Sequence, residues 1–445
     1  MAPWAGRFLR QNRWLILCGV GIELCLLYLV SLGDLRAHVP RFWLGAFPAF
    51  LAYGLGVIVV LKRPSGSLRF ILLTAALFRA TMWWSPPTLS EDVFRYVWDG
   101  RVQLAGVNPY RYPPAAPELA HLRDPIHAGI NHKEIPTIYP PVAQLFFYLV
   151  AAVRPTPGAM RLGLLLAECG ALLLLVRILN QRREDPCRVL LYAWNPLGPV
   201  EIAGGGHIDA LGVFFLLLAL HWLTTGRRWA AVWALSAAFL SKLVPVLALP
   251  VFGWRLAGRW PLLWFPVLSA LGYWWFADAG AQLFSGLATY LARWRFNDSL
   301  FSVVYHVLRD PGTGWDATAL LHTKLICAAL LVLAVGLATA RCSDPFRAVF
   351  AILGAHLLLA PTLHPWYLLW ILPFLALFPS PAWLLLSGLV FLAYDVLIDY
   401  SRTGAWVEQD WVKWAQYGPF YLLLALSQAR RLFHHLGRPS HQPAA

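Results

Sequence analysis

The chain has 445 residues, of which 59% are hydrophobic and only 13% are charged, and it carries a net charge of +14. Soluble globular domains carry about 25% charged residues, so the composition excludes a chain of soluble domains and indicates one integral membrane domain over residues 1–445. We expect no nucleic-acid partner, because the basic residues stand in short loops between apolar runs and form no continuous basic face.

Apolar runs recur from one end of the chain to the other, and several approach the roughly 20 residues that a helix needs to cross a bilayer. We therefore expect an all-α, polytopic fold with about 12–14 spans in the lipid bilayer. The runs around 140–200 and 229–255 leave the number of spans open. The clearest runs lie at 14–32, 43–61, 162–176, 210–223, 260–277, 325–340 and 383–398.

Basic loops indicate the side of the membrane, because cytoplasmic loops are enriched in Lys and Arg. With the N-terminus in the cytoplasm, the basic loop at 62–69 is also cytoplasmic, and a third span at about 70–84 leads outward. The polar segments at about 85–138, between spans 3 and 4, and at about 278–322 are then external loops, and the basic tail at about 429–445 is cytoplasmic. Nearly all unusual polar clusters fall on the outer face, which predicts a shared external cavity.

The first polar cluster reads SEDVFRYVWDGR. At this spacing Asp92, Arg95 and Asp99 share one face of a helix. Glu91 and Asp92 stand where the chain leaves the bilayer, and either carboxylate could deprotonate a hydroxyl group. The alternative is that both only stabilise the N-terminus of a helix that begins after Ser90.

Two further segments of the first external loop, GVNPY and IYPP, predict a rigid aromatic rim. Asn108 and the proline after it mark a turn, and Tyr110 and Tyr139 could stack on a sugar ring. The alternative is a well-packed interfacial loop, because Tyr is enriched where proteins meet the membrane surface.

The segment GGGHIDA places His207 and Asp209 at the beginning of a helix, where the glycines let a ligand approach the backbone. We expect both residues to contact a donor or an acceptor, and the alternative for His207 is an ordinary interfacial histidine. Two ligands without an HExxH spacing signal a metal only weakly. A divalent cation, Mg or Mn, therefore stays open beside a site that needs no cofactor.

Two further candidate site residues are basic and stand in apolar surroundings. Lys242 has apolar residues on both sides, and because an ammonium group is costly to bury in a membrane, such a lysine is functional by default. A phosphate group is its natural partner, and the alternative is that the side chain reaches up to the interface. His364, within TLHPWY, carries a similar but weaker signal.

Together these residues predict a glycosyl transfer from a lipid phosphate. The sequence has no P-loop and no other nucleotide-binding motif. Since phosphate is already a good leaving group, cations such as Lys242 and Arg101 need only stabilise its charge. One carboxylate then activates the acceptor hydroxyl from the opposite face of the sugar, with inversion, whereas a hydrolase would use two opposed carboxylates and water.

The order of the motifs resembles a known family. The string D-x-x-R-Y-x-x-D-G-R-x-x-x-x-G-x-N-P-Y, followed by YPP, NP, G-G-G-H-x-D-A, K-x-x-P and HPWY, is similar to the GT-C superfamily of polytopic membrane glycosyltransferases. It looks closest to bacterial polyprenyl-phosphate-mannose-dependent mannosyltransferases, over about residues 70–370. It resembles the GPI mannosyltransferase of the endoplasmic reticulum more distantly.

This resemblance implies that an acidic residue of the first large external loop is the catalytic base, which here is Asp92, with Glu91 adjacent. It also implies a polyprenyl-phosphate sugar donor, most simply of mannose, and a glycolipid or glycan acceptor. The active site is then expected on the outer side of the bacterial inner membrane. One departure from the commonest plan is that two spans, not one, precede the catalytic loop's own span.

A transporter or flippase for a lipid-linked or phosphorylated substrate is the main alternative, because Lys, His and Asp inside a membrane can line a substrate path. Against this alternative, the polar residues cluster on one side, and the sequence shows no inverted repeat. A lipid-linked glycan polymerase or ligase, and a non-catalytic membrane subunit, are further alternatives.

Overall fold

The computed structural model describes residues 3–62, 67–256, 258–310, 312 and 316–436. In these ranges the regular structure is helical, and the one β-type pairing is an isolated parallel bridge between Phe296 and Thr362. The predicted all-α class is therefore confirmed. The basic tail predicted at about 429–445 lies largely outside the described residues.

Helices of very different lengths make up the fold. In the first half of the chain they are α1 (Pro3–Ser31), α2 (Val39–Lys62), α3 (Leu68–Trp83), α4 (Asp92–Leu104), α5 (Pro125–Ala128), α6 (Pro141–Val153), α7 (Pro157–Gln181), α8 (Leu190–Ala193) and α9 (Asp209–Thr224). In the second half they are α10 (Arg228–Ser241), α11 (Leu249–Arg255), α12 (Trp264–Trp274), α13 (Ser285–Arg293), α14 (Leu300–Leu308), α15 (Ala317–Arg341), α16 (Pro345–Leu359), α17 (Leu372–Leu377), α18 (Pro381–Leu389), α19 (Val396–Thr403) and α20 (Asp410–Leu436).

Several helical segments of the described residues are long and apolar enough to cross a membrane. Five meet this description, at Asn12–Ser31, Arg36–Lys62, Pro157–Gln181, Ala317–Arg341 and Pro381–Thr403. Four shorter apolar helices lie at Pro141–Val153, Asp209–Thr224, Val244–Arg255 and Pro345–Leu359. A chain with multiple membrane helices is thus confirmed, and the total number of spans stays a prediction.

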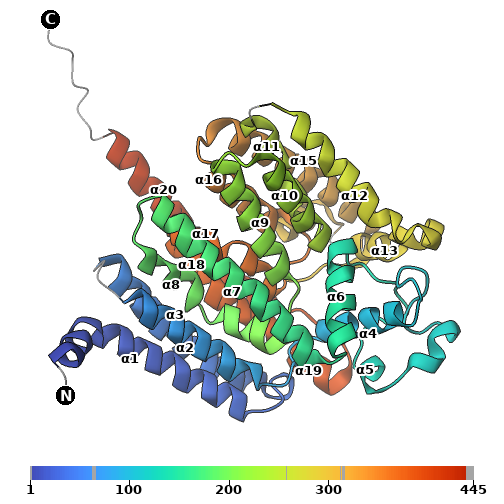
Figure 1. The fold of residues 1–445 in the computed structure, drawn as a ribbon, viewed down its shortest axis with the longest axis horizontal. Helices are drawn as coiled ribbons and strands as arrows, with labels where there is room; N and C mark the ends of the chain where they lie inside the picture. Colours follow the sequence, from blue (N-terminus) through green and yellow to red (C-terminus); the bar gives the residue numbers. More distant parts are fainter. Residues whose placement is uncertain (1–2, 63–66, 257, 311, 313–315, 437–445) are drawn as a thin grey trace, which may run out of the picture.

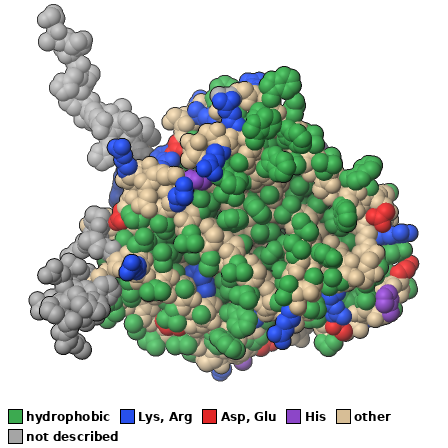
Figure 2. All heavy atoms as spheres, in the orientation of Figure 1, with side chains coloured by type: hydrophobic (Ala, Val, Ile, Leu, Met, Phe, Trp, Pro, Cys, Tyr) green, Lys and Arg blue, Asp and Glu red, His purple; other side chains and the backbone are tan. Residues whose placement is uncertain are grey.

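Large apolar side chains point outward along these helices. Leu44, Leu51 and Leu73 are 69–71% exposed, and hydrophobic side chains cover most of the face shown in Figure 2. Soluble monomers rarely expose apolar patches of such extent. This surface is therefore suited to contact with lipid.

The helices form neighbouring groups around a common core (Figure 1). α1, α2 and α3 lie side by side, α9 packs along α7 and α10, and α4 packs along α6. The main hydrophobic core is a single cluster of buried side chains, with members from Leu15 in α1 to Phe420 in α20. The polar segment predicted as the first external loop thus contains α4 and α5 and rests on helices of the core.

A close contact with α6 fixes the position of α4. A Cβ atom on Gly100 would lie only 2.4 Å from the carbonyl oxygen of Phe147, so a side chain there would push the two helices apart. The ring of Tyr96 stacks on the ring of Phe147, with 4.6 Å between centroids and 7° between planes. These contacts hold the N-terminal end of α4, where Asp92 lies, in a fixed place.

A buried ion pair connects α3, α7 and α8. Nε and Nη2 of Arg79 donate to the two carboxylate oxygens of Glu168, at 2.9 and 2.6 Å. Nη1 of Arg79 also donates to the carbonyl oxygen of Ala193, at 2.7 Å. The two side chains are only 4% and 0% exposed, so each charge depends on the other for its stabilisation.

Candidate functional site

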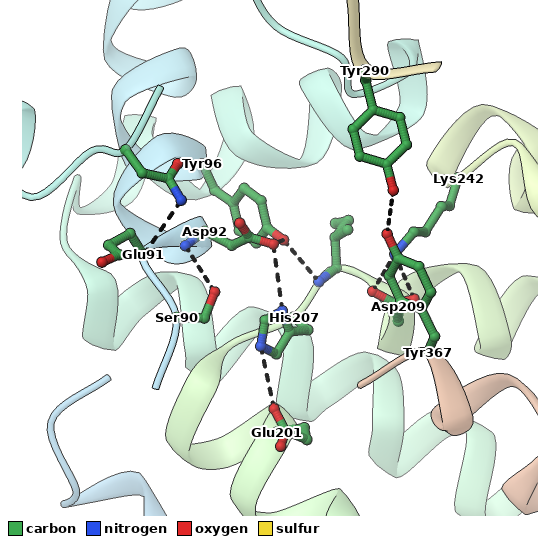
Figure 3. A network of polar contacts seen from close by, with 12 residues as sticks. Ser90, Glu91, Asp92, Tyr96, Glu201, His207, Asp209, Lys242, Tyr290 and Tyr367 are labelled. Carbon is green, nitrogen blue, oxygen red and sulfur yellow. Dashed lines mark hydrogen bonds and ion pairs between the residues drawn. The ribbon is translucent and has the colours of Figure 1, made fainter. Parts of the chain in front are cut away.

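A polar cluster lies where segments far apart in the sequence meet (Figure 3). Asp92 begins α4, Asp209 begins α9, and Lys242 directly follows α10. His207 lies just before α9, after the π-helix η4 (Pro199–Gly205). The structure therefore brings together four residues that the sequence singled out in three separate motifs.

The backbone before His207 has an unusual shape. A π-helix is rare and often marks a functional site, and this one ends at Gly206, whose φ is 79°. A Cβ atom on Gly206 would lie 2.7 Å from Cγ of Arg161. That arginine cannot easily move away, because its Nη1 donates to the carbonyl oxygens of Ala203 and Gly204.

Replacing Gly206 by Ala is expected to lower the free energy of unfolding by at least about 1 kcal/mol, because a side chain in the left-handed region costs roughly 1–2 kcal/mol even without a clash. Thermal unfolding in detergent measures this. Gly54→Ala is the matched control, because a Cβ atom at Gly54 in α2 meets nothing within 4 Å. Equal melting temperatures of the two variants would contradict the prediction.

Asp92 is the carboxylate of the cluster that reaches solvent, with 25% of its side chain exposed. Its Oδ2 lies 3.4 Å from the hydroxyl of Tyr96 and 3.6 Å from Nδ1 of His207. Burial acts to raise the pKa of Asp92, but the contact with His207, supported by Lys242, outweighs it and holds the pKa below its ordinary value. Asp92 is therefore ionised at neutral pH and able to accept a proton.

Glu91 points away from this cluster, as Figure 3 shows. Its carboxylate forms an ion pair with Arg36 and accepts a hydrogen bond from Nδ2 of Asn131, at 3.3 Å. Arg36 is in turn held by the carbonyl oxygen of Thr88, at 2.9 Å from Nε. The sequence left open which of the two adjacent acids is the functional one, and this geometry favours Asp92.

His207 is fully buried in a stack of aromatic rings. Its ring lies 3.8 Å from the ring of Trp366 at 11°, and Trp366 lies 4.4 Å from His364 at 4°. His364 thus joins the cluster through Trp366. Burial lowers the pKa of His364 to about 3, so its imidazole is neutral at physiological pH.

Lys242 has a protein partner for its charge. Its Nζ lies 2.7 Å from each carboxylate oxygen of Asp209, and Oδ1 of Asp209 also accepts from Nε1 of Trp370, at 2.6 Å. Nζ of Lys242 lies 4.3 Å from the centroid of the Tyr367 ring, a cation–π arrangement. The hydroxyl of Tyr367 lies 2.8 Å from that of Tyr290. Lys242 was expected beside a phosphate, and the structure pairs it with Asp209.

Arg95 and Asp99 form a second polar group further along α4. Nε of Arg95 donates to Oδ1 of Asp99, at 2.8 Å, and Oδ2 of Asp99 accepts from Gln144 of α6, at 2.9 Å. Nη2 of Arg95 is buried without a hydrogen-bond partner among the described residues. A buried donor of this kind is costly to leave unsatisfied, so it is suited to bind an anion.

Arg101 does not join the cluster. It forms an ion pair with Asp124, the N-cap of α5, and its Nη2 lies 3.4 Å from the carbonyl oxygen of Leu122. It follows Asp92 by nine positions, which places it on the opposite side of the helix. This pair holds the external loop on α4, and the expectation that Arg101 neutralises a phosphate stays a prediction that this position does not favour.

The segments predicted to form an aromatic rim pack against each other and against the segment that follows α12. Nδ2 of Asn108 donates to the carbonyl oxygen of Phe276, at 2.9 Å, and the hydroxyl of Tyr110 donates to the carbonyl oxygen of Tyr139, at 2.6 Å. Tyr110 is 2% exposed, which favours the alternative of a well-packed loop over stacking on a sugar. Tyr139 is half-buried and packs edge to face on Tyr96, 4.9 Å away.

Sequence reasoning missed several residues of the cluster. Glu201 could have been found by the signal that identified Lys242, because it is a charged residue in an apolar stretch. Trp366 and Tyr367 lie within the HPWY motif, of which only the histidine was singled out. Trp370 and Tyr394 carry no signal of their own, since aromatic residues are frequent throughout the chain.

The part of the chain that the structure describes shows no metal centre. No group of three or more His, Cys, Asp or Glu side chains is arranged there to hold a metal ion. His207 stands between Asp92 and Glu201 with one ring nitrogen toward each, so these three side chains do not converge on one point.

Comparison with known proteins identifies the family. A family model described as alpha-(1->6)-mannopyranosyltransferase, N-terminal domain, of the MptA/B family, matches residues 27–258, just over half of the chain. No curated protein matches. The expected resemblance is thus confirmed, and with it a sugar donor and an acceptor as substrates. The chain belongs to the MptA/B family of GT-C mannosyltransferases, which use polyprenyl-phosphate mannose.

Proposed function

We propose that this enzyme transfers mannose from a polyprenyl-phosphate donor to a lipid-linked or glycan acceptor, with Asp92 as the general base. The main support for the proposal is that the carboxylates of the cluster differ in their exposure to solvent. Asp92 has 25% of its side chain exposed, whereas Glu201 and Asp209 have 1% and 0%. Of these three, Asp92 can reach a substrate hydroxyl.

The proposed reaction is a single displacement with inversion. Asp92 accepts the proton of the acceptor hydroxyl, and the oxygen forms a bond to the anomeric carbon of mannose. The bond between that carbon and the phosphate oxygen breaks on the opposite face, and polyprenyl phosphate leaves with the electron pair. Because the leaving group is already stable as an anion, the reaction needs no general acid.

The phosphate requires a positive partner, and two residues are suited to it. Arg95 has its unsatisfied Nη2 one helical turn from Asp92. Lys242 has 20% of its side chain exposed beside its pair with Asp209, and cations near a developing phosphate charge stabilise the transition state. Both cations already pair with a carboxylate, Arg95 with Asp99 and Lys242 with Asp209. We favour Arg95, because its Nη2 has no hydrogen-bond partner among the described residues.

The location follows from the charge pattern of the loops. The site lies at the N-terminal end of α4, in the polar segment at about 85–138 that the basic loops place outside. We therefore propose a bacterial inner membrane with the active site on its periplasmic or extracellular side. A cysteine introduced at Glu134, which has 67% of its side chain exposed, tests this, because a membrane-impermeant thiol reagent should label it in intact cells.

The function is tested with purified enzyme in detergent, a panel of polyprenyl-phosphate sugars and a membrane lipid extract. We expect labelled mannose, and not labelled glucose or galactose, to appear in an acceptor. Arg95→Gln should raise the KM for the donor more than it lowers kcat. Transfer from a nucleotide sugar alone, or none from any polyprenyl-phosphate sugar, would refute the proposal.

His207→Gln is expected to shift the acid limb of the pH profile of kcat/KM to higher pH. Asp92 is active when ionised, so activity is present above its pKa and is lost as the pH falls through it. Removing the cation at His207 leaves burial to raise the pKa of Asp92, and protonation then begins at higher pH. His132→Gln, at an exposed position, is the control, and coinciding profiles of all three proteins would contradict the prediction.

A further inference from the structure

A second carboxylate lies behind His207, on the side away from Asp92 (Figure 3). Oε2 of Glu201, in η4, lies 3.4 Å from Nε2 of His207, while Nδ1 of His207 lies 3.6 Å from Oδ2 of Asp92. Glu201 is itself fixed, because the hydroxyl of Tyr394 lies 2.8 and 3.0 Å from its two carboxylate oxygens. A line of polar groups therefore runs from the exposed Asp92 into the core.

This geometry favours one protonation state of His207. A neutral imidazole has one N–H donor and one nitrogen lone pair. With a carboxylate facing each ring nitrogen, the lone pair of a neutral ring would point at an anion. Only the doubly protonated ring presents a positive N–H to both Asp92 and Glu201, and the nearly parallel Trp366 ring keeps the imidazole in its plane.

The other charged groups around His207 do not replace Glu201. Burial acts to lower the pKa of His207, and its contacts with the two carboxylates raise it above the ordinary value. Further titratable or charged groups lie in the neighbouring segments: His364 beyond Trp366, Arg161 against Gly206, the Lys242–Asp209 pair, and Tyr96 beside Asp92. None of them adds a negative charge directly at the imidazole.

We propose that Glu201, held by Tyr394, is a positioning residue that keeps His207 as an imidazolium and so keeps Asp92 ionised and aimed at the acceptor hydroxyl. The proposal rests on the proposed function in one respect, the role of Asp92 as base. Without Glu201, His207 would be a buried cation balanced by a single partly exposed carboxylate. Desolvation would then favour the neutral ring, and Asp92 would lose its cationic partner.

The experiment compares Glu201→Gln with Glu201→Asp in the full-length enzyme. Gln keeps the shape and removes the charge, whereas Asp keeps the charge and shortens the side chain. His207 is followed by NMR of the enzyme labelled with 13C in its histidine rings, and its signal is the one missing from His207→Gln. We expect His207 to titrate at a lower pH in Glu201→Gln than in the wild type, and Glu201→Asp to lie closer to the wild type.

Turnover should follow the same order. We expect Glu201→Gln to lower kcat by roughly 10- to 100-fold, by analogy with the loss of a group that orients a metal-binding histidine, with the KM for the donor nearly unchanged. Tyr394→Phe keeps the Glu201 charge but frees its orientation. It should lower kcat while leaving the titration of His207 closer to that of the wild type than Glu201→Gln does.

A purely structural role for Glu201 predicts the opposite order, with the isosteric Gln tolerated better than the shorter Asp, and that result would overturn the proposal. An unchanged His207 titration in Glu201→Gln would overturn it as well, even if turnover falls. The titration needs no substrate, so it separates the two proposals. If Asp92→Asn still transfers mannose, the proposed base is wrong, while a lowered His207 titration would keep the coupling between Glu201 and His207.

Discussion

Replacing Asp92 by Asn is expected to lower mannose transfer by at least about 100-fold, since a general base contributes typically 10²–10⁴-fold. Asn has nearly the same shape as Asp, but its amide cannot take a proton from the acceptor hydroxyl. Donor binding should persist, because no step of it needs a base. Transfer of labelled mannose and equilibrium binding of the donor, measured on the same preparations, check the two parts of the prediction.

The adjacent acid supplies the matched control. Glu91→Gln should retain most of the activity, because Glu91 is paired with Arg36 and hydrogen-bonded by Asn131 on the far side of the cluster. The stability cost should also be small, since a partly exposed ion pair contributes roughly 0–1 kcal/mol. If Glu91→Gln abolishes transfer and Asp92→Asn does not, the assignment of the base is reversed.

Replacing Glu168 by Gln is expected to lower the free energy of unfolding by about 3–5 kcal/mol, the usual cost of breaking a buried ion pair from one side. The Arg79 guanidinium, only 4% exposed, would keep its charge and lose its anionic partner. The expected result is a large fall in melting temperature in detergent, or failure to obtain folded protein at all.

The control for this prediction is an ion pair at the surface. Asp344 pairs with Arg182, and their side chains are 21% and 31% exposed. Asp344→Asn should cost roughly 0–1 kcal/mol, and because Asn also serves as an N-cap, it preserves the beginning of α16. Similar melting temperatures for the two variants would show that Arg79 finds another partner when Glu168 is neutral.

The sequence was most informative where a polar residue was out of place. Apolar runs predicted an all-helical membrane protein, because lipid leaves few other ways to satisfy the backbone. The same logic selected Lys242, since charged groups in apolar surroundings are costly unless they serve a purpose, and the glycine-rich segment GGGHIDA selected His207 and Asp209. Ser90 was also predicted near the beginning of α4, and its Oγ accepts from the backbone N–H of Asp92.

Partners could not be predicted from the sequence in the same way. Lys242 was assigned to a phosphate because its partner Asp209 lies on another helix, and only the packing of α9 against α10 brings the two together. Arg101 was assigned to a phosphate by its place in a motif. A motif does not show which residues surround a side chain in the folded protein. Glu201 carried a signal in its apolar surroundings, but its partner Tyr394 comes from a distant part of the chain and could not be predicted.

The stack of His207 on Trp366 has a consequence for how the chain can be divided. The family match ends at residue 258, and a fragment ending there would contain Asp92, Glu201 and His207 but not the Trp366 ring that stacks on His207. Trp366 and Tyr367 come from the other half. Asp92 and the aromatic rings of Trp366 and Tyr367 are therefore encoded in separate halves of the chain. Exchanging the second half between relatives would change these rings and leave Asp92 in place.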